Sequence, residues 1–164
     1  MSNASPKQRI RALVLEDEGY HGCAETALVA LQEQFGLPNA DDSSPALVLN
    51  GGIAYSGSTC GALTAAALAV GRLAAARIPD HREAKSAARY LIQEVMADFD
   101  ERFGAVDCRS LTGYDMMTDH DAFMADGAWK TACTTQIEFV VEGLAGLADE
   151  DNWRAALLRK AVPR

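Results

Sequence analysis

Residues 79–104 read PDHREAKSAARYLIQEVMADFDERFG and carry the clearest folding signal in the chain. Apolar residues recur every three or four positions, and charged residues fill the positions between them, which is the pattern of an amphipathic helix. Pro79 and Asp80 are typical helix-start residues, and Gly104 is a typical helix stop. The stretch therefore predicts one long helix. Its expected buried face is formed by Ala84, Ala88, Leu91, Ile92, Val95, Phe99 and Phe103.

Helical periodicity continues on both sides of this stretch. Further helices are expected from about Pro6 to Glu18, His21 to Gly36, Cys60 to Ala76 and Ala128 to Leu147, and around 153–158. Residues 37–44 predict a loop and residues 107–126 short helical turns. Because nothing alternates with the two-residue period of strands, the sequence predicts an all-α fold. We expect a single-domain helical bundle of about five to seven helices over residues 1–164.

Length and composition are those of an ordinary globular domain, with 164 residues, 49% hydrophobic and 23% charged. The formal net charge of -8 disfavours phosphate backbones and anionic membranes. The N-terminus has no apolar core of signal-peptide length, and the apolar stretch 62–76 is interrupted by Thr64, Gly71 and Arg72. We therefore expect a cytoplasmic protein that has neither a nucleic-acid nor a membrane partner.

Four cysteines, Cys23, Cys60, Cys108 and Cys133, are the candidate functional residues, and successive ones are 37, 48 and 25 residues apart. This density is too low for a disulfide scaffold, and the absence of Cys-x-x-Cys excludes a thioredoxin-type motif and a zinc ribbon. A reducing cytoplasm would keep the four residues as thiols, metal ligands or transient redox pairs.

The expected positions of the cysteines differ in their chemistry. Cys23 and Cys60 fall at helix starts, where the helix dipole and free amides lower the pKa of a thiol, so both are candidate catalytic or metal-binding thiolates. Cys108 is expected in an exposed loop beside Arg109. Cys133 is expected on a buried apolar helix face. Buried cysteines are also commonly inert core thiols, and this alternative stays open.

Of the three histidines, His21 is the candidate site residue. It stands two positions before Cys23, where it could bind a metal or act as the base that activates the thiol. His81 is expected on the surface at a helix start, and His120 among solvated acidic residues.

Small residues surround Cys60. Gly51 and Gly52 could supply backbone amides to a sulfur beside Cys60, or could simply allow a tight turn. A stripe of small residues at four-residue intervals would permit close helix packing, including a helix-packed homodimer. The stripe consists of Gly57, Gly61, Ala65 and Ala69.

Four blocks of the chain, between about residue 10 and about residue 148, resemble the successive blocks of the redox-active C_GCAxxG_C_C family. The blocks are GYHGCAETALVAL (19–31), GGIAYSGSTCGALTAAALAVGRL (51–73), FGAVDCRSLTGYD (103–115) and TACTTQIEFVVEGLAGL (131–147). Each block holds one of the cysteines. One departure is Ala65, which stands where the family pattern has glycine.

The resemblance implies redox activity or cluster binding centred on the four cysteines. One function is an iron–sulfur protein for electron transfer or sensing, with a redox partner that is unknown. Another is a cluster-free thiol–disulfide protein in which Cys23 and Cys60 form a reversible bridge. A third is a helical interaction module with inert thiols. The first two would make the protein an electron-transfer protein or an oxidoreductase, and both require the cysteines to meet in the folded chain.

Overall fold

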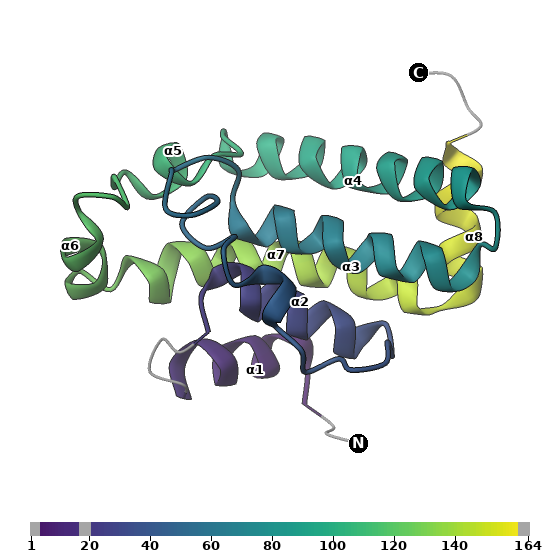
Figure 1. Cartoon of the computed structure of the whole chain (residues 1–164), viewed down its shortest axis with the longest axis horizontal. Coiled ribbons are helices and arrows are strands. Elements are labelled where there is room, and N and C mark those ends of the chain that lie inside the picture. The colour runs from purple at the N-terminus through teal and green to yellow at the C-terminus, as the bar shows by residue number, and fades with distance from the viewer. Residues whose placement is uncertain (1–3, 17–20, 161–164) are drawn as a thin grey trace.

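The structure is a computed structural model that describes residues 4–16 and 21–160, and within these ranges it is helical (Figure 1). The described residues form no strand, only an isolated antiparallel bridge between Thr59 and Asp107. The predicted all-α class is confirmed. The α-helices are α1 (Pro6–Arg11), α2 (Cys23–Gln34), α3 (Gly61–Arg77), α4 (His81–Phe103), α5 (Cys108–Thr112), α6 (His120–Ala125), α7 (Thr134–Ala145) and α8 (Glu150–Arg159).

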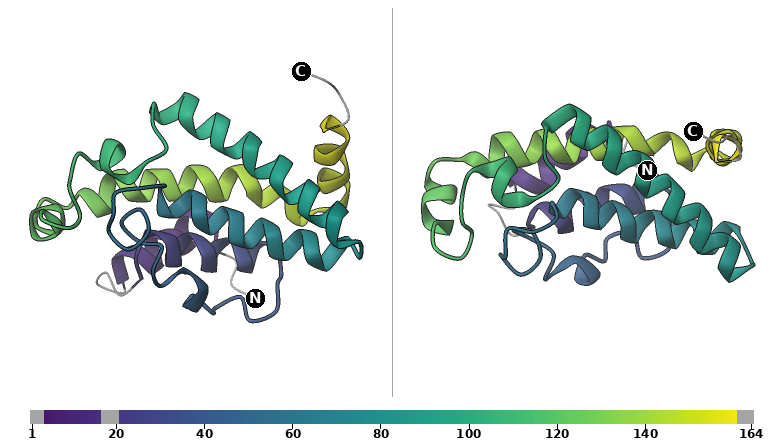
Figure 2. Two further views of the ribbon diagram at one scale, coloured as in Figure 1. Left: turned by 45° about the horizontal axis from the view of Figure 1, so that its top comes forward. Right: turned by 90° about the horizontal axis from the view of Figure 1, so that it is seen from above.

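Three long helices, α3, α4 and α7, run side by side along the molecule (Figures 1 and 2). Helix α2 packs against α3 and α7, and α1 packs against α2 and α7. Helix α8 lies at the end of the bundle where α3 leads into α4, whereas α5 and α6 lie at the opposite end (Figure 1).

The long helix predicted from residues 79–104 is confirmed as α4. The Asp80 side chain caps it by accepting a hydrogen bond from the Glu83 N–H at 2.9 Å. The helix ends at Gly104, whose φ of 77° is a left-handed conformation that suits glycine. Phe99 is fully buried, while Phe103 is only half-buried.

Two expected helices contain π-helical turns instead of continuing as regular α-helix. Helix α1 passes at Ala12–Glu16 into a π-turn, and the rest of the helix predicted to Glu18 lies outside the described residues. The helix predicted at 128–147 consists of a π-turn (Trp129–Cys133), α7 and a 3₁₀ turn (Gly146–Ala148). A π-turn inserts an extra residue and so changes which side chains face the core.

The predicted small-residue stripe packs inside the chain. Ala65 and Ala69 of α3 are completely buried, and α3 packs mainly against α2 and α4. The methyl side chains allow this close approach. Because the stripe is covered within the chain, it does not provide a surface for a homodimer.

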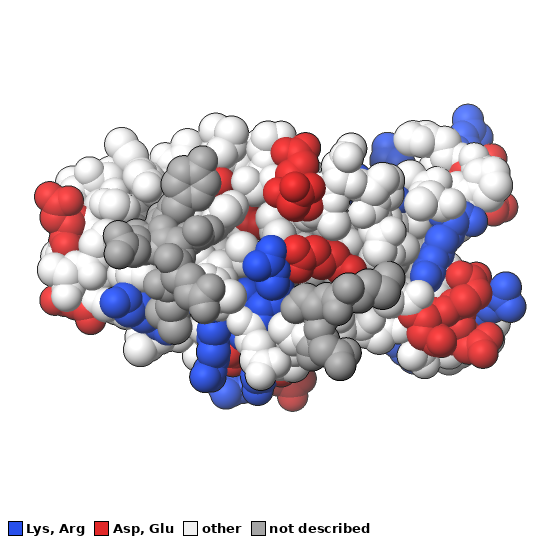
Figure 3. Space-filling model, turned by 90° about the horizontal axis from the view of Figure 1, so that it is seen from below, with Lys and Arg blue, Asp and Glu red and all other residues white. Residues whose placement is uncertain are grey.

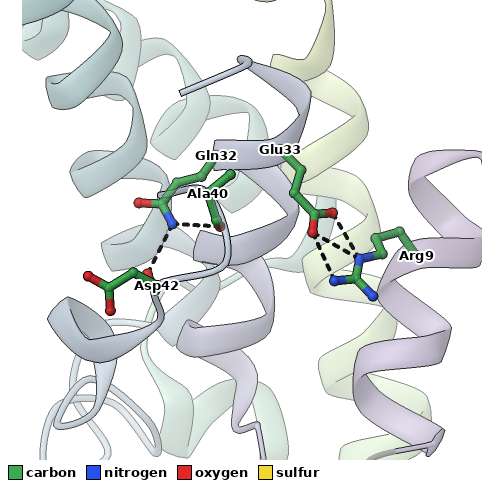
Figure 4. A network of polar contacts seen from close by, with 5 residues as sticks. All are labelled: Arg9, Gln32, Glu33, Ala40 and Asp42. Atoms are coloured by element: carbon green, nitrogen blue, oxygen red, sulfur yellow. Dashed lines mark hydrogen bonds and ion pairs between the residues drawn. The ribbon is translucent and has the colours of Figure 1, made fainter. Parts of the chain in front are cut away.

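Polar contacts fasten α2 to its neighbours (Figure 4). Arg9 of α1 pairs with Glu33 at 2.8 Å. The completely buried Gln32 donates to the carbonyl oxygens of Ala40 (3.0 Å) and Asp42 (3.1 Å). These bonds satisfy a buried amide and hold the loop after α2, which leads towards residues 47–60.

The surface carries charges of both signs. On the face shown in Figure 3, the described Lys and Arg side chains lie among acidic ones and form no continuous basic surface. Across the part of the chain that the structure describes, no helix combines the length and the apolar character that crossing a bilayer requires.

Candidate functional site

The segments that carry the four cysteines meet at the end of the bundle formed by α5 and α6 (Figure 1). Helix α2 begins at Cys23, α3 begins directly after Cys60, α5 begins at Cys108, and Cys133 ends the π-turn before α7. Cys23, Cys108 and Cys133 line one pocket of about 250 Å³. Cys60 is buried, and Cys23 and Cys108 lie close enough to contribute to raising its pKa. All four are free thiols.

Backbone pairing explains why Cys60 and Cys108 are neighbours. The Cys60 N–H donates to the Val106 carbonyl at 2.8 Å, and the Cys108 N–H donates to the Ser58 carbonyl at 2.7 Å. The two segments therefore run antiparallel around the isolated bridge. In such a pair, alternate side chains share a face, which puts Cys60 and Cys108 on the same side.

Two glycines allow the cysteine segments to approach one another. A Cβ atom at Gly61 would lie 2.5 Å from the Cys23 Sγ. A Cβ atom at Gly52 would lie 2.8 Å from the Cys108 Cβ and 2.5 Å from the Ser58 backbone. All three distances are far below a normal contact, so these two positions accept only glycine without a shift of the chain.

Asn50 organises the start of α2. The N-cap residue of this helix is Gly22, which has no side chain, and Asn50 Oδ1 accepts a hydrogen bond from the Ala24 N–H at 3.0 Å instead. The Cys23 thiol donates to the same oxygen at 3.9 Å. Asn50 Nδ2 donates to the Glu25 carboxylate at 2.9 Å, and Glu25 accepts the Gly22 N–H at 3.0 Å.

The turn that carries Asn50 to the pocket has an unusual backbone. Residues 51–55 all have positive φ, between 52° and 74°. Three of them, Ile53, Ala54 and Tyr55, are not glycine, and a left-handed conformation costs such residues about 1–2 kcal/mol each. The loop seen as a curl in Figure 1 is thus strained, and strain of this kind is commonly retained at functional sites. Gly51 and Gly52 lie in a tight turn, which is one of the two alternatives that the sequence left open.

Sulfur and aromatic side chains form another part of the pocket wall. They include Met116, Phe123 and Trp129, and the rings of Tyr55 and His120 lie 5.1 Å apart at its edge. Met116 and Phe123 are buried and form a small apolar cluster with Cys108. Cys108 and Cys133 therefore pack directly against the apolar part of the pocket wall.

Histidines reach the pocket at two places. His21, the candidate ligand, is half-buried and lines it. His120 was expected on a solvated acidic segment, and that expectation is wrong, because its ring is half-buried against Tyr55 and Phe123. His81 lies exposed at the start of α4, as predicted.

The pKa values of all four thiols are raised, mainly because burial disfavours the thiolate. The pKa of Cys60 rises to about 12 and that of Cys108 to about 11. Neighbouring cysteines raise them further, and Cys133 interacts in this way with all three others. Backbone amides at the start of α2 and α3 lower the pKa of Cys23 and Cys60, but by less than burial raises it. The predicted lowered pKa values of Cys23 and Cys60 are therefore wrong.

The surroundings predicted for Cys108 and Cys133 also differ from those found. Cys108 is the first residue of α5 and only 7% exposed, and Arg109 pairs with Asp115. The exposed-loop prediction is wrong because the Asp107 side chain starts a short helix there. Cys133 is half-buried at the pocket, since it lies in the π-turn and not in a regular helix.

Two residues of the site escaped the sequence reasoning. Glu25 stands at the third position of α2, and Gly22 with Glu25 matches the spacing of a capping box, which could have identified it. Asn50 has no such signal, because its partners in α2 are 25–27 residues away in the sequence.

Within the described residues, no three His, Cys, Asp or Glu side chains lie in positions to hold one metal ion. Comparison with known proteins gave no match to a curated protein or to a solved structure. The family described as "Putative redox-active protein (C_GCAxxG_C_C)" matches residues 21–147, a range that contains all four cysteines and the pocket residues from His21 to Ile137. The chain therefore belongs to the C_GCAxxG_C_C family of redox-active proteins.

Proposed function

We propose that the protein binds an iron–sulfur cluster through Cys23, Cys60, Cys108 and Cys133 and uses it for electron transfer or sensing. The observation that carries this proposal is the gathering of four thiols, three of which line one pocket while the fourth, Cys60, lies buried close enough for its pKa to be raised by Cys23 and Cys108. Ionising any one of these thiols makes it harder to ionise the others. A cationic iron centre would remove this repulsion, because thiolates would then bind iron instead of facing one another.

The chemistry of these residues fits such a cluster. Thiolate sulfur is a soft ligand that suits iron–sulfur centres. A single ion needs all its sulfur ligands at about 2.3 Å from one point, which the described side chains do not provide. A cluster contains several irons, so its thiolates can be spread more widely. When bound, a cluster supplies one-electron chemistry, and the apolar wall with Met116, Phe123 and Trp129 would shield it from water.

A thiol–disulfide protein is the second candidate. It is favoured by the contact between the Cys23 Sγ and the backbone of Gly61, which directly follows Cys60. The raised pKa values of Cys23 and Cys60 oppose it, because both residues are protonated at neutral pH and only the thiolate attacks a disulfide. It also leaves Cys108 and Cys133 without a role.

The proposed setting is the cytoplasm, where reducing conditions would keep the four thiols unpaired. We propose an unidentified redox partner that delivers or accepts the electron. His21 lines the same pocket as the thiols and is proposed as an additional ligand.

An anaerobic preparation assayed for iron, sulfide, zinc and free thiols tests these alternatives. A brown protein with broad visible absorption and matched iron and sulfide supports the cluster, and three or four of the single Cys→Ser variants should lose iron. His21→Ala should lower iron content, whereas His81→Ala, at the exposed start of α4, should not. Colourless protein without iron would refute the cluster. Formation of a Cys23–Cys60 bridge on oxidation would then favour the second candidate.

A further inference from the structure

We propose that Asn50, held by Glu25, is a positioning residue that fixes the Cys23 side chain at the pocket. The inference deepens the proposed function and rests on it for the role of Cys23 as a cluster ligand. It is drawn from the hydrogen bonds around the start of α2, which involve a buried carboxylate and an amide that come from different parts of the chain.

Asn50 takes the place of the missing cap of α2. A Cβ atom at Gly22 would lie 2.3 Å from the Asn50 Cγ and Oδ1, so the side chain of Asn50 fills the space that a larger residue would occupy. From there its oxygen accepts the Ala24 N–H at 3.0 Å, which is one of the free amides of the first helical turn. The first turn, with Cys23 in it, is therefore tied to the 47–60 loop.

Glu25 decides which way the Asn50 amide points. Glu25 is a buried residue, only 6% exposed, and its carboxylate accepts from the Gly22 N–H at 3.0 Å and from the Ser43 hydroxyl at 3.4 Å. A carboxylate only accepts hydrogen bonds, so the Asn50 Nδ2 must face it, at 2.9 Å. The Ala24 N–H requires an oxygen on the other side. The Glu25 carboxylate and the Ala24 N–H together allow the amide only one orientation, in which Oδ1 faces the Cys23 thiol.

The other side of the Cys23 sulfur is closed by α3, because the Sγ lies 2.5 Å from the place of a Gly61 Cβ. Cys23 thus sits between the Asn50 amide and the first residue of α3. Cys108 and Cys133 lie on other segments, and Cys60, at the end of the loop that carries Asn50, takes no part in these hydrogen bonds. A change at Asn50 should therefore affect Cys23 selectively.

Site-resolved alkylation of the full-length, reduced, iron-free protein measures this selectivity. A short pulse of iodoacetamide under native conditions is followed by mass spectrometry of the four cysteine peptides. In Asn50→Ala the rate at Cys23, relative to the mean rate of the other three, should rise about fivefold, because loss of a cap makes opening of the first turn about that much more frequent. A rise shared equally by all four thiols would show a general loss of stability and would overturn the proposal.

Asp80→Ala is the matched control. It removes the cap of α4, because the Asp80 side-chain oxygen accepts the Glu83 N–H at 2.9 Å. The start of α4 lies at the end of the bundle away from the pocket (Figure 1). It should lower the melting temperature by a similar amount and leave the relative rate at Cys23 unchanged. A relative rise at Cys23 in this control as large as in Asn50→Ala would also overturn the proposal.

Variants of the two side chains test the orientation. Asn50→Asp places two carboxylates in contact, and Glu25→Ala removes the acceptor of the Asn50 Nδ2, so each should raise the relative rate at Cys23. Glu25→Gln can keep an oxygen at the position of Oε2, which accepts both the Gly22 N–H and the Asn50 Nδ2, and can turn its NH2 group to the Ser43 hydroxyl, so it should keep the rate within about twofold of the original. An unchanged relative rate at Cys23 in Glu25→Ala refutes the role of Glu25. Because the protein in this assay holds no iron, failure of the cluster proposal would leave these results interpretable.

Discussion

Gly61 and Gly71 lie in the same helix, α3, and alanine at the two positions should have opposite effects on stability. At Gly61 a Cβ atom would meet the Cys23 Sγ at 2.5 Å and the Ala24 nitrogen at 3.0 Å. At Gly71 it would meet no heavy atom within 4 Å. The pair therefore separates the contact between α2 and α3 from the general preference of helices for alanine.

The magnitude follows from these distances. Non-bonded heavy atoms pack comfortably at about 3.5–4.0 Å, so Gly61→Ala must move Cys23 or separate α2 from α3 by about 1 Å. Overpacking of this kind typically costs about 1–3 kcal/mol. Gly71→Ala should gain up to about 1 kcal/mol. The two variants should thus differ in free energy of unfolding by roughly 2–4 kcal/mol, or about 6–12 °C in melting temperature for a chain of this size.

Urea and thermal unfolding followed by circular dichroism measure the difference on reduced, iron-free protein. Gly61→Ala should be the less stable variant and should also change the alkylation rate of Cys23, whereas Gly71→Ala should leave that rate unchanged. If Gly61→Ala matched Gly71→Ala in stability and kept the original rate at Cys23, the tight contact of Cys23 with α3 would be refuted.

Three further predictions concern the core and the thiols. The buried Thr26 hydroxyl has no hydrogen-bond partner among the described residues, so Thr26→Val should raise the free energy of unfolding by about 1 kcal/mol, and an unchanged or lower urea midpoint would contradict this. In the folded protein the pKa values are raised to about 12 for Cys60 and about 11 for Cys108, against an ordinary value of 9.0. As the pH rises, these two thiols therefore lose their protons in the unfolded chain at a lower pH than in the folded protein. The urea midpoint should therefore fall as pH rises above about 9, and fall less in Cys60→Ser. Phe99→Asp and Val140→Asp, at sites exposed by 0% and 1%, should each abolish cooperative unfolding in melting experiments, and normal melting would show that the helix faces are assigned wrongly.

Local signals predicted the helices well because their causes are local. The start and end of α4 depend on Asp80 and Gly104, which act on their own helix, and both were identified from the sequence. The placement of Cys23 and Cys60 at helix starts was also predicted, although the cap of α2 comes from Asn50 in another segment. The π-turn before α7 was not predicted, because one extra residue in a helical turn leaves the apolar pattern almost unchanged.

The chemistry of the thiols could not be predicted in the same way. A helix start lowers the pKa of a cysteine, but burial raises it, and burial depends on segments that meet only in the folded chain. Cys60 shows this conflict directly: the amides of Ala62 and Leu63 favour its thiolate, yet its pKa rises to about 12. The sequence therefore assigned the wrong sign to the pKa shifts of Cys23 and Cys60.

The glycines near the cysteines explain why the fold can gather four distant thiols. Gly22 precedes Cys23, but the space that it leaves is filled by Asn50. Gly61 follows Cys60, but its missing side chain makes room for Cys23. Each glycine therefore serves a contact with another segment, and not the cysteine beside it in the sequence. The glycine of the Cys-Gly-Ala pattern is thus a packing requirement as much as a chemical one: a larger residue at Gly61 should disturb Cys23, which is distant in the sequence, and one at Gly22 should displace the equally distant Asn50.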